Sequence, residues 1–363
     1  MTIGVLGGGQ LGRMLALAGI PLGLRFRFLD PDPQAPAGVV GDLITTKYDD
    51  AEGLDALAGS CDLVTYEFEN VPDAAARRLL EHVPVFPPPE ALQIAQDRLH
   101  EKRFFRSLDI PTAPFEPVDT PEDLDRALAR IGTPAILKTR RFGYDGKGQY
   151  VLRSRDDAPH AWQALGGVPL ILEGFVPFDR ELSIIGVRGR SGELAFYPLV
   201  ENHHREGILR LSIAPAPGWT PELQAQAESE ARRVLERLGY VGVLTIELFA
   251  CGDVLVANEM ACRVHNSGHW TIEGSIASQF ENHVRAVCGL PLGSTRSLGA
   301  SAMLNFIGDH PPVAEMLAIP DLHVHLYGKS PRAGRKVGHA TLCAADGAEL
   351  ARRLEIVRSR LGL

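Results

Sequence analysis

Two glutamates on either side of a short turn are the residues of this chain best suited to chemistry. Glu247 and Glu259 lie in two β-like runs that flank the turn 250–253, so a hairpin would bring their carboxylates within a few ångströms of each other. Two close, buried carboxylates are unfavourable unless a cation lies between them, and oxygen ligands of this kind suit Mg²⁺. Leu255 and Ala257 would lie on the same face of the strand as Glu259, and their apolar character argues against two exposed glutamates on an amphipathic hairpin. The sequence therefore predicts a magnesium site that would bridge the hairpin to substrate phosphates.

A glycine-rich loop with two nearby lysines predicts a polyphosphate site. Lys138 ends the buried-looking run 135–138, and the loop 143–149 reads Gly-Tyr-Asp-Gly-Lys-Gly-Gln, with Lys147 inside it. Glycines let backbone amides approach phosphate oxygens, and the ammonium groups neutralise the phosphate charge. The segment is not a Walker A sequence, because Gly-Lys-Ser/Thr does not follow the required spacer. A charged hairpin tip in solvent is the alternative interpretation of this loop.

A second glycine-rich turn lies near the N-terminus. Residues 7–12 match the pattern G-x-G-x-x-G, follow the apolar run 2–6 and open a predicted helix over 10–18. Asp30 ends the next predicted strand, in the place of the acidic residue of a dinucleotide-binding motif. Small residues let backbone N–H groups approach a phosphate at a helix N-terminus. Three interpretations remain open: a nicotinamide or flavin dinucleotide, the phosphate of another ligand, or a tight turn with a purely structural role.

The segment 258–270, around and after the second glutamate, is dense in Asn, Arg, His and Ser. Arg263 could hold a phosphate or carboxyl oxyanion through two parallel hydrogen bonds. His265 and His269 are candidates for the same site, with a buried core histidine as the alternative. A zinc site is disfavoured by the ligand spacing, and Cys262 has no base positioned by the sequence to activate it as a nucleophile. The segment therefore predicts an anion-binding part of the site.

The most basic segment is 327–339, which contains Lys329, Arg335 and Lys336. The chain has 37 Lys and Arg against 45 Asp and Glu, a formal net charge of −8, so an anionic ligand needs a local basic cluster of this kind. A basic run is most often a solvated loop. Together with the N-terminal glycine turn, it could instead close around a sugar phosphate.

Length and composition limit the class of protein. At roughly 150 residues per domain, 363 residues predict two or three domains, and 45% apolar with 23% charged residues is typical of globular proteins. No apolar run approaches the roughly 18 residues that cross a bilayer, and the N-terminus lacks the basic start of a secretion signal. The acidic balance argues against a general nucleic-acid binder, and five scattered cysteines argue against a disulfide framework. We therefore expect a cytoplasmic protein with no membrane and no nucleic-acid partner.

The elements that would position these residues change in kind along the chain. Short apolar strands alternate with helices over the first ninety residues, which predicts βαβ units and a parallel sheet, and the prolines at 87–89 end this part. A helix-rich stretch, then mainly β-like runs, and after Pro291 a smaller strand-and-helix segment follow. The predicted strands are 2–6, 25–29, 62–66, 135–138, 170–173, 181–187, 194–200, 208–213, 243–249, 254–259, 302–307 and 323–327; the predicted helices are 10–18, 73–81, a region within 90–107, 223–238 and 347–360.

The order of these motifs resembles the ATP-grasp superfamily and, within it, the N5-carboxyaminoimidazole ribonucleotide synthetases of purine biosynthesis. The resemblance extends from Ile3 to about His339, and Cys262 departs from it, since a proline is expected before Arg263. It implies a fold that is α/β and α+β. An N-terminal parallel-sheet βαβ domain (1–95), of Rossmann-like type, would precede an ATP-grasp domain (96–290) with a mobile lid at about 110–172, and a small C-terminal β-rich domain (291–363) would follow.

The resemblance also implies the reaction and the residues that perform it. Members convert 5-aminoimidazole ribonucleotide, bicarbonate and ATP to the N5-carboxylated ribonucleotide, ADP and phosphate, with ATP and Mg²⁺ as cofactors, as a homodimer. The implied nucleotide-binding residues are Arg98, Lys138, Gly143, Tyr144, Asp145, Gly146, Lys147, Gly148, Gln149, Glu173, Gly174, Phe175, Val176, Glu181, His204, Asn258 and Glu259, with 173–176 on the adenine edge and Glu181 on the ribose hydroxyls. The implied ribonucleotide-binding residues are Gln10, Leu11, Glu69, Tyr144, Asp145, His265, Asn266, Lys329, Arg335 and Lys336. Metal ligands would be Glu247 and Glu259, and catalytic residues Arg263, Lys138, His265 and Asp145.

The chemistry leaves several alternatives open. Bicarbonate would attack the ATP γ-phosphorus to give carboxyphosphate, and either this intermediate or free carbon dioxide would meet the exocyclic amine. His265, Asp145 or a substrate phosphate would accept the amine proton. Other functions remain possible: another ATP-grasp carboxylase or ligase acting on a phosphorylated small molecule, a nicotinamide oxidoreductase built on residues 7–12, and a catalytically silent nucleotide-binding regulator.

Overall fold

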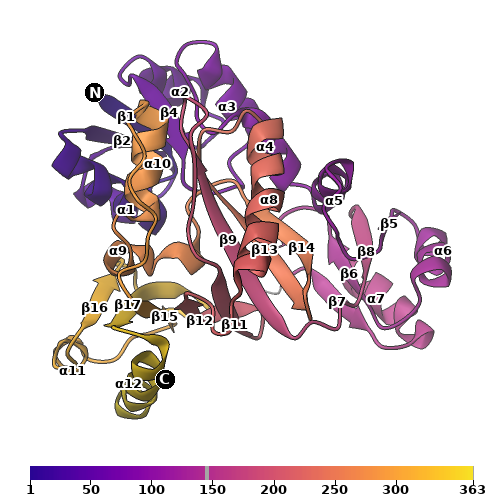
Figure 1. Ribbon diagram of the computed structural model, residues 1–363. Coiled ribbons are helices and arrows are strands. Elements are labelled where there is room, and N and C mark those ends of the chain that lie inside the picture. Colours follow the sequence, from indigo (N-terminus) through magenta and orange to yellow (C-terminus); the bar gives the residue numbers. More distant parts are fainter. Residues whose placement is uncertain (144–146, 363) are drawn as a thin grey trace.

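The structure is a computed structural model that describes residues 1–143 and 147–362 (Figure 1). Its N-terminal part is a parallel sheet with the strand order β3-β2-β1-β4, flanked by helices, as the alternating pattern predicts. The central strands are buried because their apolar runs lie between two helical layers. The elements are β1 (Thr2–Leu6), α1 (Gln10–Gly19), β2 (Arg25–Asp30), β3 (Asp42–Thr45), α2 (Ala51–Ala58), β4 (Leu63–Tyr66) and α3 (Asp73–Leu80), with short 3₁₀ turns at Ile20–Leu22 and Pro36–Val39.

Two elements of this part, β3 and α2, are absent from the sequence-based prediction. β3 is a partly exposed edge strand whose four residues include an exposed aspartate and threonine, so it lacks the apolar run of a central strand. α2 begins after Asp50, whose side chain accepts a hydrogen bond from the Gly53 amide.

The helix-rich stretch predicted within 90–107 consists of two helices, α4 (Pro89–Ala95) and α5 (Arg98–Ser107). The break falls at Asp97, because its side chain accepts from the Leu99 amide at 3.0 Å and so caps a new helix. α5 lies against β14 of the central sheet. The helix therefore projects its side chains toward the region of the predicted magnesium site.

The next part stands apart at the right of Figure 1 and has its own antiparallel sheet in the order β5-β8-β6-β7. Its core is separate from the other buried clusters and includes Leu137, Leu152 and Leu172. This part corresponds to the segment for which a lid is expected. Its elements are β5 (Phe115–Val118), α6 (Pro121–Ile131), β6 (Ala135–Thr139), β7 (Gln149–Leu152), a 3₁₀ turn (Arg155–Asp157), α7 (Ala158–Leu165) and β8 (Leu170–Gly174).

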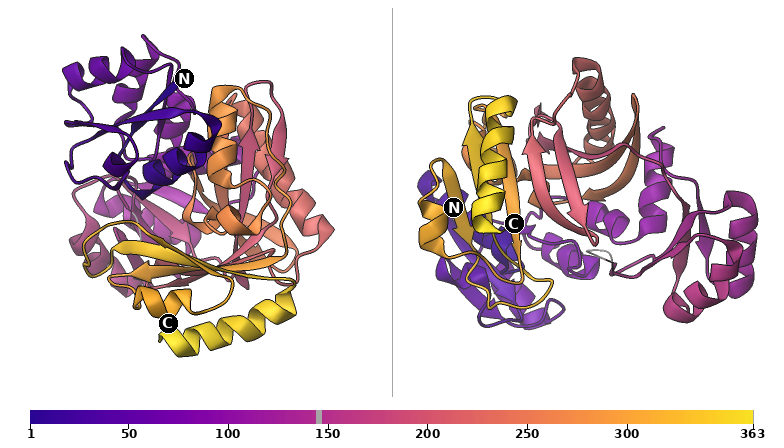
Figure 2. Two further views of the ribbon diagram at one scale, coloured as in Figure 1. Left: turned by 90° about the vertical axis from the view of Figure 1, so that its left-hand side faces the viewer. Right: turned by 90° about the horizontal axis from the view of Figure 1, so that it is seen from below.

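The largest sheet has the strand order β14-β13-β9-β11-β12-β15-β17-β16, and β10 pairs with β9. The C-terminal strands are hydrogen-bonded into it through β12 and β15, so one sheet runs without interruption from the hairpin β13–β14 to the C-terminal strands (Figure 2). Its elements are β9 (Arg180–Arg188), β10 (Leu194–Phe196), β11 (Val200–Arg205), β12 (Ile208–Ala214), α8 (Pro221–Arg237), β13 (Gly242–Cys251), β14 (Val254–Ala261), a 3₁₀ turn (Asn266–Gly268), α9 (Thr271–Gly274), α10 (Gln279–Cys288), β15 (Ala300–Ile307), α11 (Val313–Leu317), β16 (Leu322–Leu326), β17 (Lys336–Ala344) and α12 (Gly347–Leu361).

Two predictions for this sheet are wrong in detail. The strand predicted over 194–200 is two strands, β10 and β11, with residues 197–199 between them. The Tyr197 amide still donates to the Ile185 carbonyl of β9 at 2.9 Å, and its side chain is buried. β17 is absent from the sequence-based prediction: it begins at Lys336, inside the basic segment 327–339, and pairs with β15 and β16. β17 is buried on both faces, so its sequence carries no polar–apolar alternation.

The β13–β14 hairpin contains a bulge that moves side chains between its faces. Glu247 pairs with Glu259, but the next pair is Leu248 with Ala257, so Asn258 is the extra residue. Ala257 therefore faces the core with Leu255, whereas Asn258 and Glu259 both face the site. The prediction that Leu255 and Ala257 share the face of Glu259 is wrong, because strict alternation stops at the bulge.

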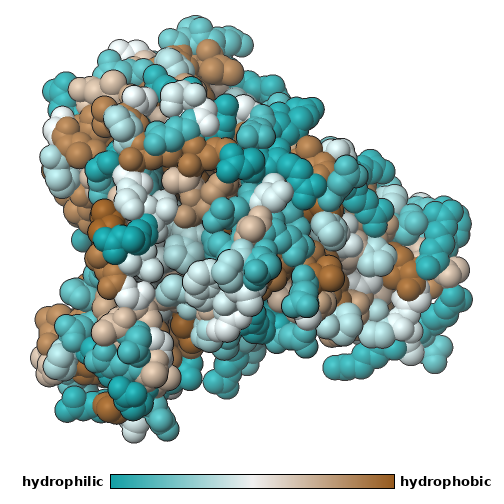
Figure 3. All heavy atoms as spheres, viewed as in Figure 1, coloured by the Kyte–Doolittle hydropathy of each residue, from teal (hydrophilic) through white to brown (hydrophobic). Residues whose placement is uncertain are grey.

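The described helices include none that is long and apolar enough to cross a membrane. The face shown in Figure 3 is mainly hydrophilic, and hydrophobic side chains gather toward its upper left, over the N-terminal part. The predicted fold class is confirmed: a parallel-sheet N-terminal part precedes mixed and antiparallel sheets.

Candidate active site

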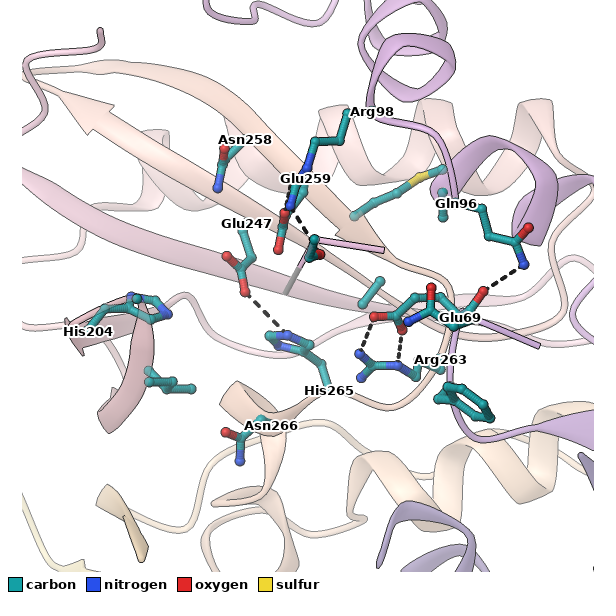
Figure 4. A pocket seen from close by; sticks show the side chains of 18 of the residues that line it. Glu69, Gln96, Arg98, His204, Glu247, Asn258, Glu259, Arg263, His265 and Asn266 are labelled. Atoms are coloured by element: carbon teal, nitrogen blue, oxygen red, sulfur yellow. Dashed lines mark hydrogen bonds and ion pairs between the residues drawn. The ribbon is translucent and has the colours of Figure 1, made fainter. Parts of the chain in front are cut away.

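A cavity of about 620 Å³ lies where the N-terminal turn, α5, the β13–β14 hairpin and the C-terminal strands meet (Figure 4). Most of the predicted site residues line it: Gln10, Leu11, Glu69, Arg98, Lys138, Gly143, Gln149, Glu181, His204, Glu247, Asn258, Glu259, Arg263, His265, Asn266, Lys329 and Lys336. The predicted residues Lys147, Gly148, Glu173, Gly174, Phe175, Val176 and Arg335 lie outside this lining, and Tyr144, Asp145 and Gly146 lie outside the described residues.

Glu247 and Glu259 are directly paired across the hairpin, and their carboxylates lie side by side in the cavity, as the sequence predicts. Burial, followed by the charge of Glu259, raises the pKa of Glu247 to about 7. Burial alone would also raise the pKa of Glu259, but the charge and hydrogen bond of Arg98, whose Nη1 lies 2.8 Å from Oε2, hold it below its usual range. Arg98 therefore neutralises Glu259 alone. A second cation beside Glu247 would stabilise its ionised form.

These residues fit a magnesium ion. The described residues contain no group of three or more His, Cys, Asp and Glu that could hold a metal by themselves. Beside the two carboxylates, however, the buried side-chain oxygen of Asn258 has no hydrogen-bond partner among the described residues. Mg²⁺ commonly takes one or two carboxylates and completes its shell with water and substrate phosphates, so an incomplete all-oxygen set suits it.

Lys138 belongs to a buried charge network at the same end of the cavity. Its Nζ donates to Glu173 Oε2 at 2.9 Å, and Lys102 Nζ lies 3.5 Å from that oxygen. Lys102 is 1% exposed, and its Nζ also donates to the Asn258 carbonyl at 2.6 Å. Burial would raise the pKa of Glu173, but the two lysines lower it to about 2. Glu173 is therefore an ionised carboxylate shared by two ammonium groups.

Sequence reasoning missed Glu101 and Lys102. Glu101 accepts the Met260 amide at 2.7 Å, and burial followed by the charge of Glu259 raises its pKa to about 8. The spacing of Arg98, Glu101 and Lys102 is i, i+3 and i+4, which places all three on one face of α5. The sequence contains that spacing. It did not point to a site because three charged residues on one face of a short helix are normally exposed to solvent.

The segment 173–176 is less free to meet an adenine than the resemblance implies. The Gly174 amide donates to the Pro114 carbonyl at 2.8 Å, and the Phe175 amide to the Pro134 carbonyl at 3.2 Å. Nearby, Phe178 and Phe249 line the cavity with stacked rings whose centroids are 4.5 Å apart. This aromatic pair, which the sequence did not reveal, provides an apolar surface beside the carboxylates.

His204 and Glu181 form an ion pair, with Nδ1 2.9 Å from Oε2. Burial would lower the pKa of His204, but the hydrogen bond to Glu181 and the charge of Glu247 raise it. Both side chains come from neighbouring strands, β11 and β9, on the cavity side of the sheet. A polar pair of this kind can meet hydroxyl groups of a ligand.

Arg263 and Glu69 are bound to each other through a two-bond ion pair. Arg263 Nη2 donates to Glu69 Oε1 at 2.8 Å, Nε donates to Oε2, and Nη1 donates to the Val264 carbonyl at 3.0 Å. A guanidinium has five N–H groups, so two of them remain available. The structure thus brings a predicted catalytic residue and a predicted ribonucleotide-binding residue into direct contact.

His265 lies between Glu247 and a buried hydroxyl. Its Nε2 is 3.3 Å from Glu247 Oε1, and its Nδ1 accepts from the Ser267 amide at 3.3 Å and lies 2.9 Å from Ser267 Oγ. Burial, then the charges of Arg263 and Lys336, lowers its pKa to about 3. A neutral ring whose Nδ1 is an acceptor carries its proton on Nε2, which points to Glu247. His269, the second candidate, borders the cavity, but its ring is 1% exposed and packs on Phe280, so it combines the site position with the burial of a core histidine.

The glycine turn at residues 7–12 holds carboxylates of the protein itself. The Gly9 and Gly12 amides donate to Glu67 at 2.5 and 2.7 Å, and the Gly8 amide donates to Asp30 at 2.7 Å. These amides are therefore not presented to a dinucleotide. Asp30 also accepts from the Tyr48 hydroxyl at 2.8 Å, so it serves the turn and not a ribose.

The basic cluster divides between the cavity and the loop that precedes β17. Lys329 and Lys336 line the cavity, and Lys329 donates to the Gln10 side chain. Arg335 instead donates to Ser330 Oγ at 3.0 Å within the loop. Asn266, at the other wall, exchanges amide hydrogen bonds of 2.6 and 3.0 Å with Asn305. The structure thus joins the N-terminal turn to the C-terminal strands.

Three protein families match consecutive parts of the chain. Residues 1–96 match the ribonucleotide synthetase preATP-grasp domain, residues 103–280 the ATP-grasp domain, and residues 301–353 the phosphoribosylaminoimidazole carboxylase C-terminal domain. The order of these families agrees with the order of the motifs from which the resemblance was drawn.

Relatives of known identity match nearly the whole chain. N5-carboxyaminoimidazole ribonucleotide synthase from Pseudomonas aeruginosa is 58% identical over 359 residues, which are 99% of each chain. The crystal structure of the synthetase from Thermus thermophilus has a TM-score of 0.96 and 59% identity, with 99% of both chains covered. The synthase from Aspergillus clavatus, in complex with ADP and 5-aminoimidazole ribonucleotide, has a TM-score of 0.92 and 33% identity, with 99% of this chain and 98% of that chain covered.

These relatives confirm the resemblance drawn from the motifs, and with it the assignment of the chain as an ATP-grasp ligase. The chain belongs to the N5-carboxyaminoimidazole ribonucleotide synthase family.

Proposed function

We propose that the protein carboxylates 5-aminoimidazole ribonucleotide with bicarbonate and ATP, giving N5-carboxyaminoimidazole ribonucleotide, ADP and phosphate in purine biosynthesis. One observation carries this proposal: a single cavity has a carboxylate-and-lysine end suited to a metal-bound triphosphate and a lysine-and-amide end suited to a sugar phosphate. The Aspergillus relative with ADP and the ribonucleotide supports it.

ATP lies at the α5 end of the cavity. Arg98 and Lys138 contact its phosphates, the loop 143–149 covers them, Glu181 and His204 meet the ribose, and 173–176 borders the adenine. Since the Gly174 and Phe175 amides already have acceptors, the Val176 backbone is the donor available to the adenine edge. The stacked Phe178 and Phe249 rings flank this region.

Glu247 and Glu259 hold Mg²⁺, with the Asn258 oxygen beside them. When bound, the ion neutralises negative charge on the triphosphate and the transferring phosphoryl group. The charge network around Lys138 supports this arrangement as well. Because Lys102 also contacts Glu173, Lys138 can turn toward a phosphate without leaving that carboxylate unpaired.

The ribonucleotide lies at the other end of the cavity, which is lined by Gln10, Leu11, Glu69, His265, Asn266, Lys329 and Lys336. The proposed set also includes Tyr144, Asp145 and Arg335, which the resemblance implies. Lys329 and Lys336 neutralise its phosphate, together with amides of the N-terminal turn. Glu69 orients Arg263 through their two hydrogen bonds. This division puts the exocyclic amine between the phosphate site and the metal site.

The reaction follows from this placement. A bicarbonate oxygen attacks the γ-phosphorus, the bond to ADP breaks, and carboxyphosphate forms. The two remaining N–H groups of Arg263 bind this intermediate, the amine attacks its carboxyl carbon, and phosphate leaves. His265 acts as a donor that orients Glu247, because its Nδ1 is already an acceptor from Ser267. Asp145 or a substrate phosphate then receives the amine proton.

A phosphate-release assay that omits each substrate in turn tests the proposal. We expect release to require ATP, bicarbonate and aminoimidazole ribonucleotide together, and the product to contain one bicarbonate carbon. Release with formate and a different ribonucleotide would assign the chain to another ATP-grasp reaction. Magnesium is tested in the same assay by chelation and re-addition.

The proposal also covers the oligomeric state of the protein, its location and its domain boundaries. We expect a homodimer in the cytoplasm, and domains at 1–95, 96–290 and 291–363 with the lid at about 110–172. Light scattering at several concentrations measures the oligomeric state. Limited proteolysis with and without ATP tests the lid, which nucleotide should protect.

A further inference from the structure

The N-terminal glycine turn contains a built-in anion. Glu67 follows β4 directly, and its neighbour in the sheet, β1, leads into the turn, so the carboxylate lies at the shared carboxyl end of two parallel strands. Its two oxygens accept the Gly9 amide at 2.5 Å and the Gly12 amide at 2.7 Å. Glu67 is 7% exposed. In a dinucleotide-binding fold this position belongs to a ligand phosphate.

The glycines of the motif make room for this side chain. A methyl group on Gly7 would clash with Glu67 Cγ, and one on Gly9 would clash with Glu67 Oε1. Gly7 also has a φ of 104°, which favours glycine. The pattern that resembles a ligand-binding motif is therefore explained by an internal carboxylate.

Glu67 uses a specific subset of the amides at the start of α1. It takes Gly9, the N-cap, and Gly12, the third residue of the helix, whereas the amides of Gln10 and Leu11 between them have no acceptor within residues 1–143 and 147–362. The side chain of Gln10 receives the Lys329 ammonium, whose charge also faces Glu67. Glu67 thus fixes the turn that presents the Gln10 and Leu11 amides to the cavity, together with the Gln10 side chain that binds Lys329.

We infer that Glu67 is a positioning residue for the phosphate of the ribonucleotide: it occupies part of the helix N-terminus and thereby fixes Gln10, Leu11 and Lys329 in the geometry that recognises that phosphate. This inference rests on the proposed function, since it concerns the same ribonucleotide. It gives the glycine motif of this chain a role that does not involve a dinucleotide. Glu67 itself touches no reacting atom.

The experiment compares Glu67→Gln with the wild type on two substrates, aminoimidazole ribonucleotide and the corresponding riboside without phosphate. A glutamine can accept only one of the two amides and turns an N–H toward the other. We expect the KM for the ribonucleotide to rise at least tenfold and the preference for the ribonucleotide over the riboside to fall by a similar factor. The KM for ATP should change less than twofold.

Asp62→Asn is the matched control. Asp62 precedes β4 and accepts the Thr2 amide at 2.6 Å, so it joins the same two strands at the opposite end of the sheet. It should leave both KM values and the phosphate preference unchanged. If Glu67→Gln does not fold, Gly9→Ala takes its place, because the added methyl group displaces the carboxylate while Glu67 is retained.

The outcomes separate the inference from the proposed function. An unchanged phosphate preference in Glu67→Gln, or equal rises in the KM for ATP and ribonucleotide, overturns the positioning role. A wild type that releases no phosphate with ribonucleotide, bicarbonate and ATP overturns the proposed function itself. A selective loss of phosphate preference, reproduced by Gly9→Ala, supports the inference.

Discussion

The two ends of the cavity hold their buried charges in different ways. At the α5 end, charged side chains pair with one another: Arg98 with Glu259, and Lys138 and Lys102 with Glu173. At the N-terminal end, Arg263 and Glu69 also form a side-chain pair, but the carboxylate of Glu67 is held by backbone amides. Side-chain pairs can exchange partners when a ligand brings new charge, whereas backbone amides in a turn are fixed. The difference predicts an adaptable nucleotide end and a preorganised ribonucleotide end.

Glu259→Gln should give the largest effect, because it removes one carboxylate of the proposed metal site and the partner of Arg98. We expect turnover to fall by about three orders of magnitude, near 4 kcal/mol in the barrier, with the fold retained. Phosphate release over a range of Mg²⁺ concentrations measures it. Glu236→Gln, on the exposed side of α8, is the control and should keep wild-type turnover. Full activity in Glu259→Gln would refute the metal assignment.

Lys336→Ala tests whether the two ends act separately. Lys336 lines the cavity at the start of β17, and removing a phosphate-binding charge at that end should raise the KM for the ribonucleotide roughly tenfold to thirtyfold, about 1.5–2 kcal/mol. The KM for ATP should rise far less. Steady-state kinetics with each substrate varied in turn decide this. Equal changes in both KM values would contradict the division of the cavity. Lys47→Ala, on the exposed surface after β3, serves as the control.

Glu230 on α8 is a buried carboxylate that is paired neither with a charged side chain nor with backbone amides. Its substitution should give the smallest effect. Its side chain is 2% exposed, one oxygen has no partner among the described residues, and burial raises its pKa to about 7. The folded-state pKa is raised, so the stability that the protonated group provides is complete below about pH 4.5 and is lost as pH rises through 7.

Glu230→Gln should therefore be more stable than the wild type by about 1–2 kcal/mol at pH 8 and nearly equal to it at pH 5. Urea unfolding at the two pH values measures the difference. Glu236→Gln again provides the exposed control. An identical pH dependence in wild type and Glu230→Gln would show that burial at this position carries no such cost.

Much of the fold was accessible from the sequence, because strands in a parallel sheet and a hairpin around residues 250–253 leave clear patterns. The glycine turn, Lys138 and the Glu247–Glu259 pair were found for the same reason: each is a local pattern with a chemical meaning. The bulge at Asn258 was not predictable, since strict alternation gives no sign of an inserted residue. Its effect is to bring a third oxygen-bearing side chain to the site.

What escaped prediction depends on distant contacts. Glu67 meets a turn more than fifty positions away, and Lys102 meets a carbonyl more than 150 positions away. Glutamate and lysine are usually exposed residue types, and only the folded structure shows that Glu67 and Lys102 are buried. A sequence pattern reports neighbours along the chain, so buried charges that pair across domains are the residues it most often assigns to solvent.

The continuous sheet has a consequence for the C-terminal region. β15 is hydrogen-bonded to β12 along four residue pairs, from Leu211 with Leu304 to Ala214 with Ser301. A protein cut near residue 290 would leave β12 with a bare row of amides and carbonyls, which invites pairing with another molecule. The C-terminal strands therefore cover an edge of the large sheet. Chains that end near residue 290 should aggregate rather than remain in solution as smaller enzymes.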